Sequence, residues 1–279
     1  MLLEHCLKQN KTWILVHSEK ELSAEQFSWL TEAVAKRKTG LPVAYITGLK
    51  EFYGYDFIVS PSVLIPKPDT EILVEKAIDE IIAKIEFRPE IILSVCDMCA
   101  GSGCIGISVL KNLIEEYKIP SEKLPKFTFA DISEEALNIA KQNAKNLLPS
   151  EEFEELRFIQ TNLFSEVPFT FDLILTNPPY IPAKMVTELL KDGRNEPRLA
   201  LDGDIGIFGE PTEQNDGLGI IRRLVPESYG HLAHNGVLLM ETGEYNAEAT
   251  KNIFEQNNFR CTKIFKDLEG QDRNVYGIR

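Results

Sequence analysis

Long apolar runs are missing from this sequence of 279 residues. No stretch approaches the roughly 18 apolar residues of a membrane-spanning helix. Residues 1–10 carry Glu4 and Lys8 among only a few apolar residues, unlike a signal peptide. The five cysteines are an odd number without the spacing of a disulfide framework. We therefore expect a cytoplasmic protein that is neither secreted nor bound to a membrane.

An excess of positive charge is also missing. The chain has 30 Lys and Arg residues against 43 Asp and Glu residues, a net charge of -13. Proteins that neutralise phosphates need clustered Lys and Arg, so we expect no direct contact with nucleic acid, although a local basic patch is not excluded. Residues 1–60 hold seven basic and seven acidic side chains, so the acidic excess belongs to the rest of the chain. This asymmetry is weak support for two modules.

The front of the chain shows helical and then hairpin patterns. Ser23 and Gln26 have capping-box spacing before an amphipathic run that Gly40 can end, which predicts a small helical domain over residues 1–41 with internally packed apolar faces. Two stretches are short, aromatic and broken by glycine, as hairpin strands are. They are residues 44–48 and 52–59, and we expect a linking β-hairpin over residues 42–62.

The remainder, residues 63–279, alternates strand-like apolar runs with helical patterns. This rhythm predicts an α/β fold with a doubly wound, mostly parallel sheet. No internal repeat or low-complexity segment interrupts it. The expected strands are residues 91–97, 127–130, 156–160, 171–176, 236–241 and 261–265, and the clearest helices are residues 107–113 and 133–146.

Two prolines frame Lys67 between the hairpin and the sheet. They exclude a helix at that position, after which Asp69 or Thr70 can cap an amphipathic helix. A rigid lead-in to this helix and a site-lining role for Lys67 are equally open. A Gly-, Asp- and Glu-rich segment, residues 202–216, is expected to be a mobile insertion over the carboxyl edge of the sheet.

The chain is organised around Asn177-Pro178-Pro179-Tyr180, which follows the expected buried strand 171–176. Active sites of open α/β sheets lie at such strand ends. The two prolines stiffen the loop. The Asn177 side-chain carbonyl and the Pro178 backbone carbonyl can converge on one planar –NH2 group, with the Tyr180 ring beside it. The sequence therefore predicts a pocket for an amide or amino nitrogen, and the alternative is a proline-stiffened turn.

A glycine-rich turn, residues 98–106, follows the strand that ends at Asp97. Gly101 and Gly103 allow a ligand to approach the backbone, and a second acid, Asp131, ends the next strand and can accept both hydroxyls of a ribose. The spacing of Gly101, Gly103 and Gly106 also fits a dinucleotide site. A hydride-transfer enzyme has no use for the acceptor pocket at Asn177, whereas a methyl donor paired with an amino acceptor does.

The cysteines near this turn do not indicate a metal. Cys96, Cys99 and Cys104 have no fourth ligand nearby, and their segment is committed to a strand and a glycine loop. We expect no metal site, because a role as small buried side chains is sufficient to explain these cysteines. The four histidines are scattered and receive no role.

Together these segments resemble the PrmC/HemK family. The likeness rests on residues 177–180, 97–105 and 65–71, and it extends to residues 42–54, 196–201, 216–218 and 270–273. It implies a class I S-adenosylmethionine-dependent methyltransferase with a seven-stranded sheet. It also implies that the substrate is the glutamine amide in the Gly-Gly-Gln motif of class I peptide chain release factors. The N-terminal helical domain would dock that protein, and the enzyme would act as a monomer.

Carried over by position, the resemblance assigns site residues. Asn177, Pro178, Pro179 and Tyr180 would hold the acceptor glutamine, with Asn177 and Pro178 acting in catalysis. The cofactor-binding residues would be Asp97, Cys99, Ala100, Gly101, Ser102, Gly103, Asp131, Asn162, Leu163 and Asn177. Three features depart from the family pattern: Lys67 replaces the more frequent Arg, Asn162 and Leu163 stand where an acid and an aromatic are common, and the segment 202–216 is longer.

Two other functions fit parts of the sequence. A nucleic-acid amino methyltransferase would use the same pocket after base flipping, but it would need a basic target-recognition domain. A non-catalytic binding module could retain the nucleoside site alone. Labelled methyl transfer to a release factor or to nucleic acid would separate these alternatives.

Overall fold

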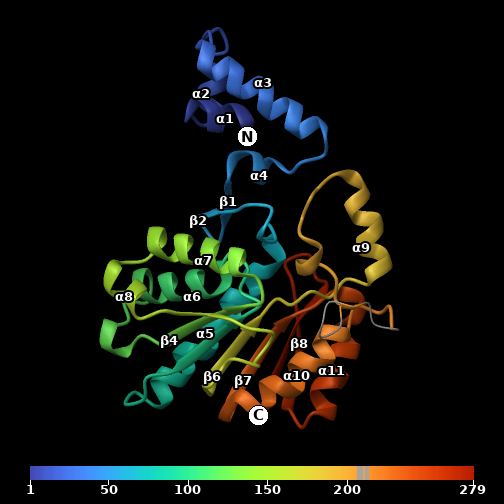
Figure 1. Ribbon diagram of the computed structural model, residues 1–279. Coiled ribbons are helices and arrows are strands. Elements are labelled where there is room, and N and C mark those ends of the chain that lie inside the picture. The colour runs from blue at the N-terminus through green and yellow to red at the C-terminus, as the bar shows by residue number, and fades with distance from the viewer. Residues whose placement is uncertain (206–209, 211–213) are drawn as a thin grey trace.

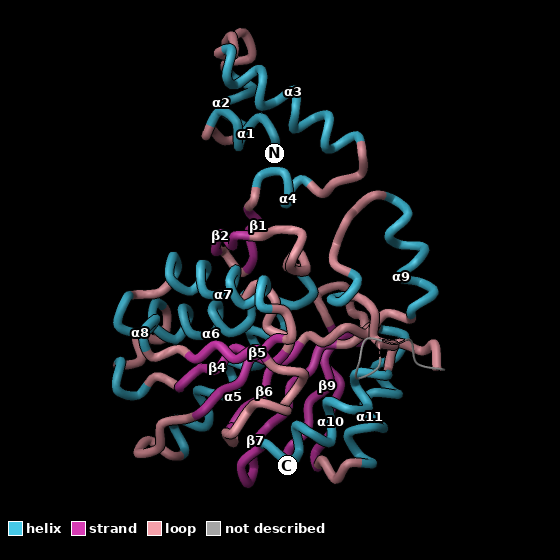
Figure 2. The backbone as a smooth tube through the Cα atoms, in the orientation of Figure 1, coloured by secondary structure: helices cyan, strands magenta, loops and turns pink. Residues whose placement is uncertain are grey.

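A computed structural model describes residues 1–205, 210 and 214–279 of the chain. A small helical unit leads through a two-stranded hairpin into a seven-stranded sheet with helices on both faces (Figures 1 and 2). The helices are α1 Leu2–Leu7, α2 Lys11–Val16, α3 Ala24–Lys38, α4 Val43–Thr47, α5 Glu71–Phe87, α6 Cys104–Glu115, α7 Glu134–Leu147, α8 Ser150–Glu154, α9 Ala183–Leu189, α10 Gly219–His231 and α11 Ala247–Gln256. The strands are β1 Leu49–Phe52, β2 Tyr55–Ile58, β3 Ser94–Met98, β4 Lys126–Asp131, β5 Arg157–Gln160, β6 Phe171–Thr176, β7 Leu232–Glu241, β8 Arg260–Lys266 and β9 Asp272–Ile278.

The large sheet has the strand order β5-β4-β3-β6-β7-β9-β8. Strands β5, β4, β3, β6 and β7 pair in parallel, and β9 pairs antiparallel with both β7 and β8. The predicted doubly wound, mostly parallel α/β sheet is confirmed, and β6 has the expected bounds. Strand β9 was not identified among the expected strands, since Asp272 and Arg273 at its start are charged.

Alternate residues of the central strands fill two hydrophobic cores. Val95 and Leu173 belong to the core under α5, α6 and α7, whereas Cys96 and Ile174 belong to the core under α10 and α11. Figure 1 shows these two groups of helices on opposite sides of the sheet. A strand buried on both faces needs apolar residues at every position, which explains the continuous apolar runs in the sequence.

The N-terminal helices α1 to α3 stand apart from the sheet, with α4 and the hairpin between them (Figure 1). The capping box is confirmed: Ser23 Oγ accepts the Gln26 N–H, and Gln26 Oε1 accepts the Ser23 N–H. We expected the apolar side chains of this helical unit to pack internally, and this expectation is wrong for Phe27, which is 64% exposed.

The expected hairpin strand over residues 44–48 is wrong. These residues belong to helix α4, which Pro42 precedes and Gly48 ends. Gly48 has a φ of 75°, and its N–H donates to Ala44 O at 2.8 Å, as in a helix C-cap. The hairpin itself is β1 and β2, within the expected range 42–62. Among the residues that the structure describes, no helix is both long and apolar enough to cross a membrane.

Candidate functional site

A cavity of about 640 Å³ opens at the carboxyl edge of the sheet. The loops that follow β3, β4, β5 and β6 all contribute to its wall, as expected for an open α/β sheet. Its volume lies within the range of small-molecule sites, about 300–1,000 Å³. The predicted residues that line it are Cys99, Ala100, Gly101, Ser102, Asp131, Asn162, Leu163, Asn177 and Pro179.

The glycine-rich loop is shaped by three left-handed residues. Cys99, Gly101 and Gly103 have φ values of 58°, 54° and 75°. A Cβ at Gly101 would meet nothing within 4 Å, so this position is an open part of the cavity wall. A Cβ at Gly103 would instead meet Ile107 Cδ1 at 2.8 Å. Gly101 therefore leaves room for a ligand, whereas Gly103 allows close packing behind the loop.

Asp131 joins the loops after β3 and β4. Its Oδ2 accepts the Gly101 N–H and its Oδ1 accepts the Ser133 N–H, both at 2.9 Å. Burial raises the pKa of Asp131, while the N–H groups of Ser133 and Gly101 lower it. Each carboxylate oxygen retains a second lone pair, so Asp131 can still accept ligand hydroxyls.

Asp97 lies behind the cavity wall. Its side chain is fully buried, and its Oδ2 accepts the Gly106 N–H at 2.9 Å. Oδ1 has no hydrogen-bond partner among the described residues. Burial raises the pKa of Asp97 to about 8. Asp97 fastens the start of α6 to β3, and a direct ligand contact stays a prediction.

Asn162 and Leu163 lie together on the loop after β5. Asn162 Oδ1 accepts a hydrogen bond from Arg223 Nη2 at 3.1 Å, and Arg223 on α10 also lines the cavity. Leu163 has a φ of 53° although it is not glycine. Non-glycine residues with this backbone cost free energy and cluster at functional sites.

Asn177 is the polar group of the Asn-Pro-Pro-Tyr loop that faces the cavity. Its Nδ2 donates to Thr70 Oγ1 at 3.2 Å. Among the described residues, neither Asn177 Oδ1 nor Pro178 O accepts a hydrogen bond, and of these two residues only Asn177 lines the cavity. Thr70 occupies the expected N-cap position of α5, but its side chain makes no capping hydrogen bond.

Pro178 and Tyr180 lie on the protein side of the loop. Pro178 is buried, and neither residue lines the cavity. The Tyr180 hydroxyl donates to Glu241 Oε1 at 3.2 Å, and burial raises the pKa of Tyr180. A Cβ at Gly217 would come within 2.1 Å of Tyr180 O, so this glycine packs directly against the loop. These contacts hold Tyr180 on the side of the loop that faces away from the cavity. A contact between Tyr180 and an acceptor stays a prediction.

The segment 202–216 begins as packed structure. Asp202 and Asp204 are buried, and Asp204 Oδ1 accepts the Gly217 N–H at 2.8 Å. A mobile insertion is therefore wrong for these first residues. At the other end of the segment, Asp216 Oδ1 accepts the Leu218 N–H at 3.1 Å. The expectation also covers residues 206–209 and 211–213, which lie outside the described residues.

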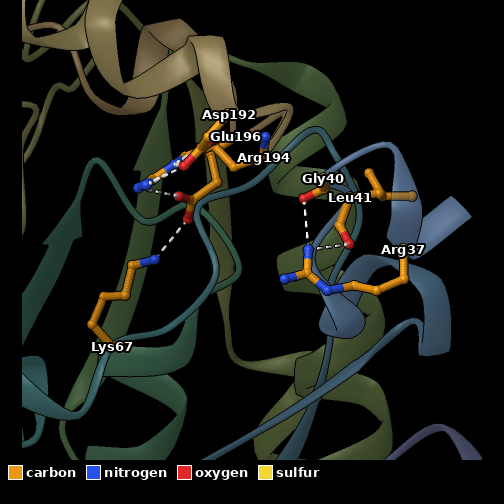
Figure 3. A network of polar contacts seen from close by, with 7 residues as sticks. All are labelled: Arg37, Gly40, Leu41, Lys67, Asp192, Arg194 and Glu196. Atoms are coloured by element: carbon orange, nitrogen blue, oxygen red, sulfur yellow. Dashed lines mark hydrogen bonds and ion pairs between the residues drawn. The ribbon is translucent and has the colours of Figure 1, made fainter.

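Lys67 lines the cavity and a second groove beside the N-terminal helices. Its Nζ lies 2.7 Å from Oε1 of Glu196, whose side chain is buried (Figure 3). Arg194 Nη1 lies 4.0 Å from the other oxygen of Glu196. Lys67 therefore lies in the cavity wall and directly before the 3-10 helix Pro68–Thr70 that leads into α5.

The cysteines are all free thiols. Cys99 and Cys104 line the cavity, and burial raises the pKa of both. No group of three or more His, Cys, Asp or Glu side chains in the described part of the chain could hold a metal ion.

Several cavity residues were not predicted. Ile132 and Thr161 directly follow β4 and β5, so the strand-end rule could have found them. Thr70, Leu199, Ile220 and Arg223 come from other elements, and no local pattern marks them.

Comparison with known families and proteins gives full-length matches. The PrmC N-terminal domain family matches residues 1–48, and the methyltransferase small domain family matches residues 81–207. The release factor glutamine methyltransferase of Koribacter versatilis is 37% identical over 282 residues, which cover 99% of this chain and 89% of that protein. The Haemophilus influenzae protein of the same name is 31% identical over 281 residues, covering 100% and 89%.

Solved structures share the fold. A methyltransferase from Pyrococcus furiosus has a TM-score of 0.52 at 14% identity, covering 89% of this chain and 98% of that one. The catalytic domain of hMettl16 has a TM-score of 0.53 at 14% identity, covering 87% and 81%. At such identities the likeness shows a methyltransferase fold alone. The two full-length relatives show more, and the chain therefore belongs to the PrmC family of release factor glutamine methyltransferases.

Proposed function

We propose that the chain transfers a methyl group from S-adenosylmethionine to the glutamine side-chain amide nitrogen in the Gly-Gly-Gln motif of class I peptide chain release factors. The observation that carries this proposal is the orientation of Asn177. Its Nδ2 is committed to Thr70, which leaves Oδ1 as an acceptor at the cavity. The full-length relatives are release factor glutamine methyltransferases, which supports the same substrate class.

The residues present fit this cofactor. Asp131 can accept the two ribose hydroxyls, the open wall at Gly101 leaves room for a ligand next to the backbone, and Asn162 and Leu163 can flank a base. Cys99, Ala100, Ser102 and Gly103 would complete the loop. When bound, S-adenosylmethionine supplies an electrophilic methyl group on a sulfonium.

The acceptor must be oriented because an amide nitrogen is a poor nucleophile whose lone pair is delocalised into its carbonyl. Asn177 Oδ1 and the Pro178 carbonyl would each accept one N–H of the glutamine amide and aim its nitrogen at the methyl group. Positioning of two reactants can supply roughly 7–11 kcal/mol. The same two acceptors would stabilise the positive charge that develops on nitrogen, so that the nitrogen could lose a proton to solvent after transfer without a general base. Pro179 and Tyr180 would keep the loop rigid.

The N-terminal helices would dock the protein substrate, since a single glutamine offers little for recognition. Leu15, Val16 and Phe27 support this role, because they are 68%, 73% and 64% exposed. We further propose a cytoplasmic monomer without direct nucleic-acid or membrane contact. The net charge of -13 and the free thiols support this assignment.

Labelled methyl transfer tests the function. The protein is incubated with radiolabelled S-adenosylmethionine and either a release factor, the same factor with its motif Gln replaced by Ala, or RNA and DNA. We expect label in the unchanged release factor alone. Label in nucleic acid would favour the amino methyltransferase alternative, and donor binding without transfer would favour a binding module.

A further inference from the structure

Arg223 places a positive charge in the cavity wall without a carboxylate partner. Among the described residues, Lys67 and Arg223 are the Lys and Arg side chains that line the cavity. Lys67 is paired with Glu196. Arg223 forms no ion pair with a described residue, and its Nη2 donates to the neutral side chain of Asn162 at 3.1 Å. The charge of Arg223 is therefore available to a ligand in the cavity.

The contact with Asn162 orients the guanidinium of Arg223 without neutralising it. A guanidinium has five N–H donors and no acceptor, so Asn162 must turn Oδ1 toward it. This hydrogen bond uses one of the five donors. The planar fork of the guanidinium is thereby held at the wall, with further N–H groups that can bind an acceptor.

Arg223 lies at the end of the cavity where the base of the donor would lie. The strands β6, β3, β4 and β5 are neighbours in this order, so their loops follow one another along the edge of the sheet. Asn177 follows β6, Asp131 ends β4, and Asn162 lies two residues beyond β5. A donor with its methyl group near Asn177 and its ribose at Asp131 would therefore extend its base toward Asn162 and Arg223.

Helix α10 holds the loop after β5 at two points. Arg223 and Glu227 are four positions apart, a spacing that places both on one face of the helix. Arg223 donates to Asn162, and Glu227 Oε2 accepts the Phe164 N–H at 3.2 Å. Leu163, which has a φ of 53° and lines the cavity, lies between these two points. The guanidinium is thus presented from a helix that is fastened to the loop.

The chemistry of adenine fits this group. The ring nitrogens of adenine are hydrogen-bond acceptors, and a guanidinium supplies donors alone. We propose that Arg223 is a donor-binding residue that donates a hydrogen bond to a ring nitrogen of the adenine of S-adenosylmethionine, with Asn162 orienting its guanidinium. This inference rests on the proposed function, because it assigns a further contact to the same cofactor.

Calorimetry with S-adenosylhomocysteine, the product that remains after methyl transfer, tests this contact without requiring turnover. Arg223→Met keeps the long apolar stem of the side chain and removes its N–H donors. We expect the Kd for S-adenosylhomocysteine to rise about tenfold or more, as for the loss of one charge-assisted hydrogen bond.

Arg222→Met is the matched control. Arg222 precedes Arg223 on α10, pairs with Asp216 and does not line the cavity. The Kd of Arg222→Met for S-adenosylhomocysteine should equal that of wild type.

Three analogues of S-adenosylhomocysteine separate a direct contact from a role in holding the loop. They carry C–H in place of N1, N3 or N7 of the adenine. One of the three should bind wild type about tenfold more weakly than S-adenosylhomocysteine. Arg223→Met should bind that analogue and S-adenosylhomocysteine equally, because the group that distinguishes them has been removed.

An unchanged Kd for Arg223→Met would overturn the proposal. Equal weakening of S-adenosylhomocysteine and all three analogues by Arg223→Met would also overturn it, because Arg223 would then only hold the loop. Both results are obtained with a wild-type protein that binds S-adenosylhomocysteine. They are therefore distinct from a failure of the proposed function, in which wild type binds this product but transfers no methyl group to a release factor.

Discussion

Gly40 and Gly193 lie against each other so closely that neither has room for a side chain. A Cβ on Gly193 would come within 2.1 Å of Thr39 O and 3.2 Å of Gly40 Cα, and a Cβ on Gly40 would come within 2.1 Å of Asp192 O. Gly40 follows α3, and Gly193 lies in the loop after α9. Figure 3 shows Gly40 and Asp192 in this region. This backbone contact joins the end of α3 to the loop after α9.

Gly193→Ala should destabilise this contact. Gly54 is the matched control, because both residues have a φ of 78° but a Cβ on Gly54 would meet nothing within 4 Å. Both alanines carry the backbone cost of about 1–2 kcal/mol, and only Gly193→Ala adds a clash with backbone. We expect a larger loss of stability in denaturant for Gly193→Ala, together with weaker binding of the protein substrate. Equal losses of stability for Gly193→Ala and Gly54→Ala would show that the backbone contact at Gly193 contributes nothing to the stability of the fold.

Lys67→Met should leave the Glu196 carboxylate buried without its nearer cation. We expect a loss of about 1–2 kcal/mol in unfolding free energy, below the cost for a fully buried pair because the Lys67 side chain is 42% exposed. Adding Glu196→Gln should recover part of this loss, and Lys67→Arg should retain the pair. If the double variant is as unstable as the sum of the singles, the pair does not couple.

Asp131→Ala should weaken donor binding. The substitution removes the carboxylate that joins Gly101 to Ser133 and that would accept hydrogen bonds from the ribose hydroxyls. We therefore expect the Kd for S-adenosylmethionine to rise about tenfold or more. Calorimetry measures this, with Glu134→Gln as the control because Glu134 is exposed on α7 outside the cavity wall. An unchanged Kd in folded Asp131→Ala would refute the assignment.

The pH dependence of the free energy of unfolding should show the titration of the Asp97 carboxyl group. Its folded pKa is raised to about 8, above its ordinary value of 3.8, so the folded protein holds a proton that the unfolded chain releases between these values. Stability should therefore fall as pH rises from 4 to 8. Relative to wild type, Asp97→Asn should gain up to about 1.4 kcal/mol per pH unit across this window. The free energy of unfolding is measured in denaturant without donor and plotted against pH for the two proteins. Parallel plots would contradict this prediction.

The sequence predicts the parts of this protein that depend on local pattern. Strand β6 and the capping box at Ser23 follow from apolar runs and side-chain spacing. Helix α4 was missed because four of its five residues are aromatic or β-branched, and only the flanking Pro42 and Gly48 indicate a helix. Thr70 was expected at the N-cap of a helix, and its contact with Asn177 was missed because Asn177 lies 107 positions away in the chain. Cavity residues such as Arg223 depend on the packing of whole helices.

We propose that Asn177 orients the acceptor amide and does not chiefly hold the donor. The most direct measurement is kcat for methyl transfer to a release factor by Asn177→Ala, paired with the donor Kd of the same protein. Loss of a positioned polar contact in a transition state typically costs roughly 10²–10³-fold in kcat. We predict a loss of that order with a donor Kd within about threefold of wild type, equivalent to under about 0.7 kcal/mol. A comparable loss of donor affinity and turnover would contradict the account.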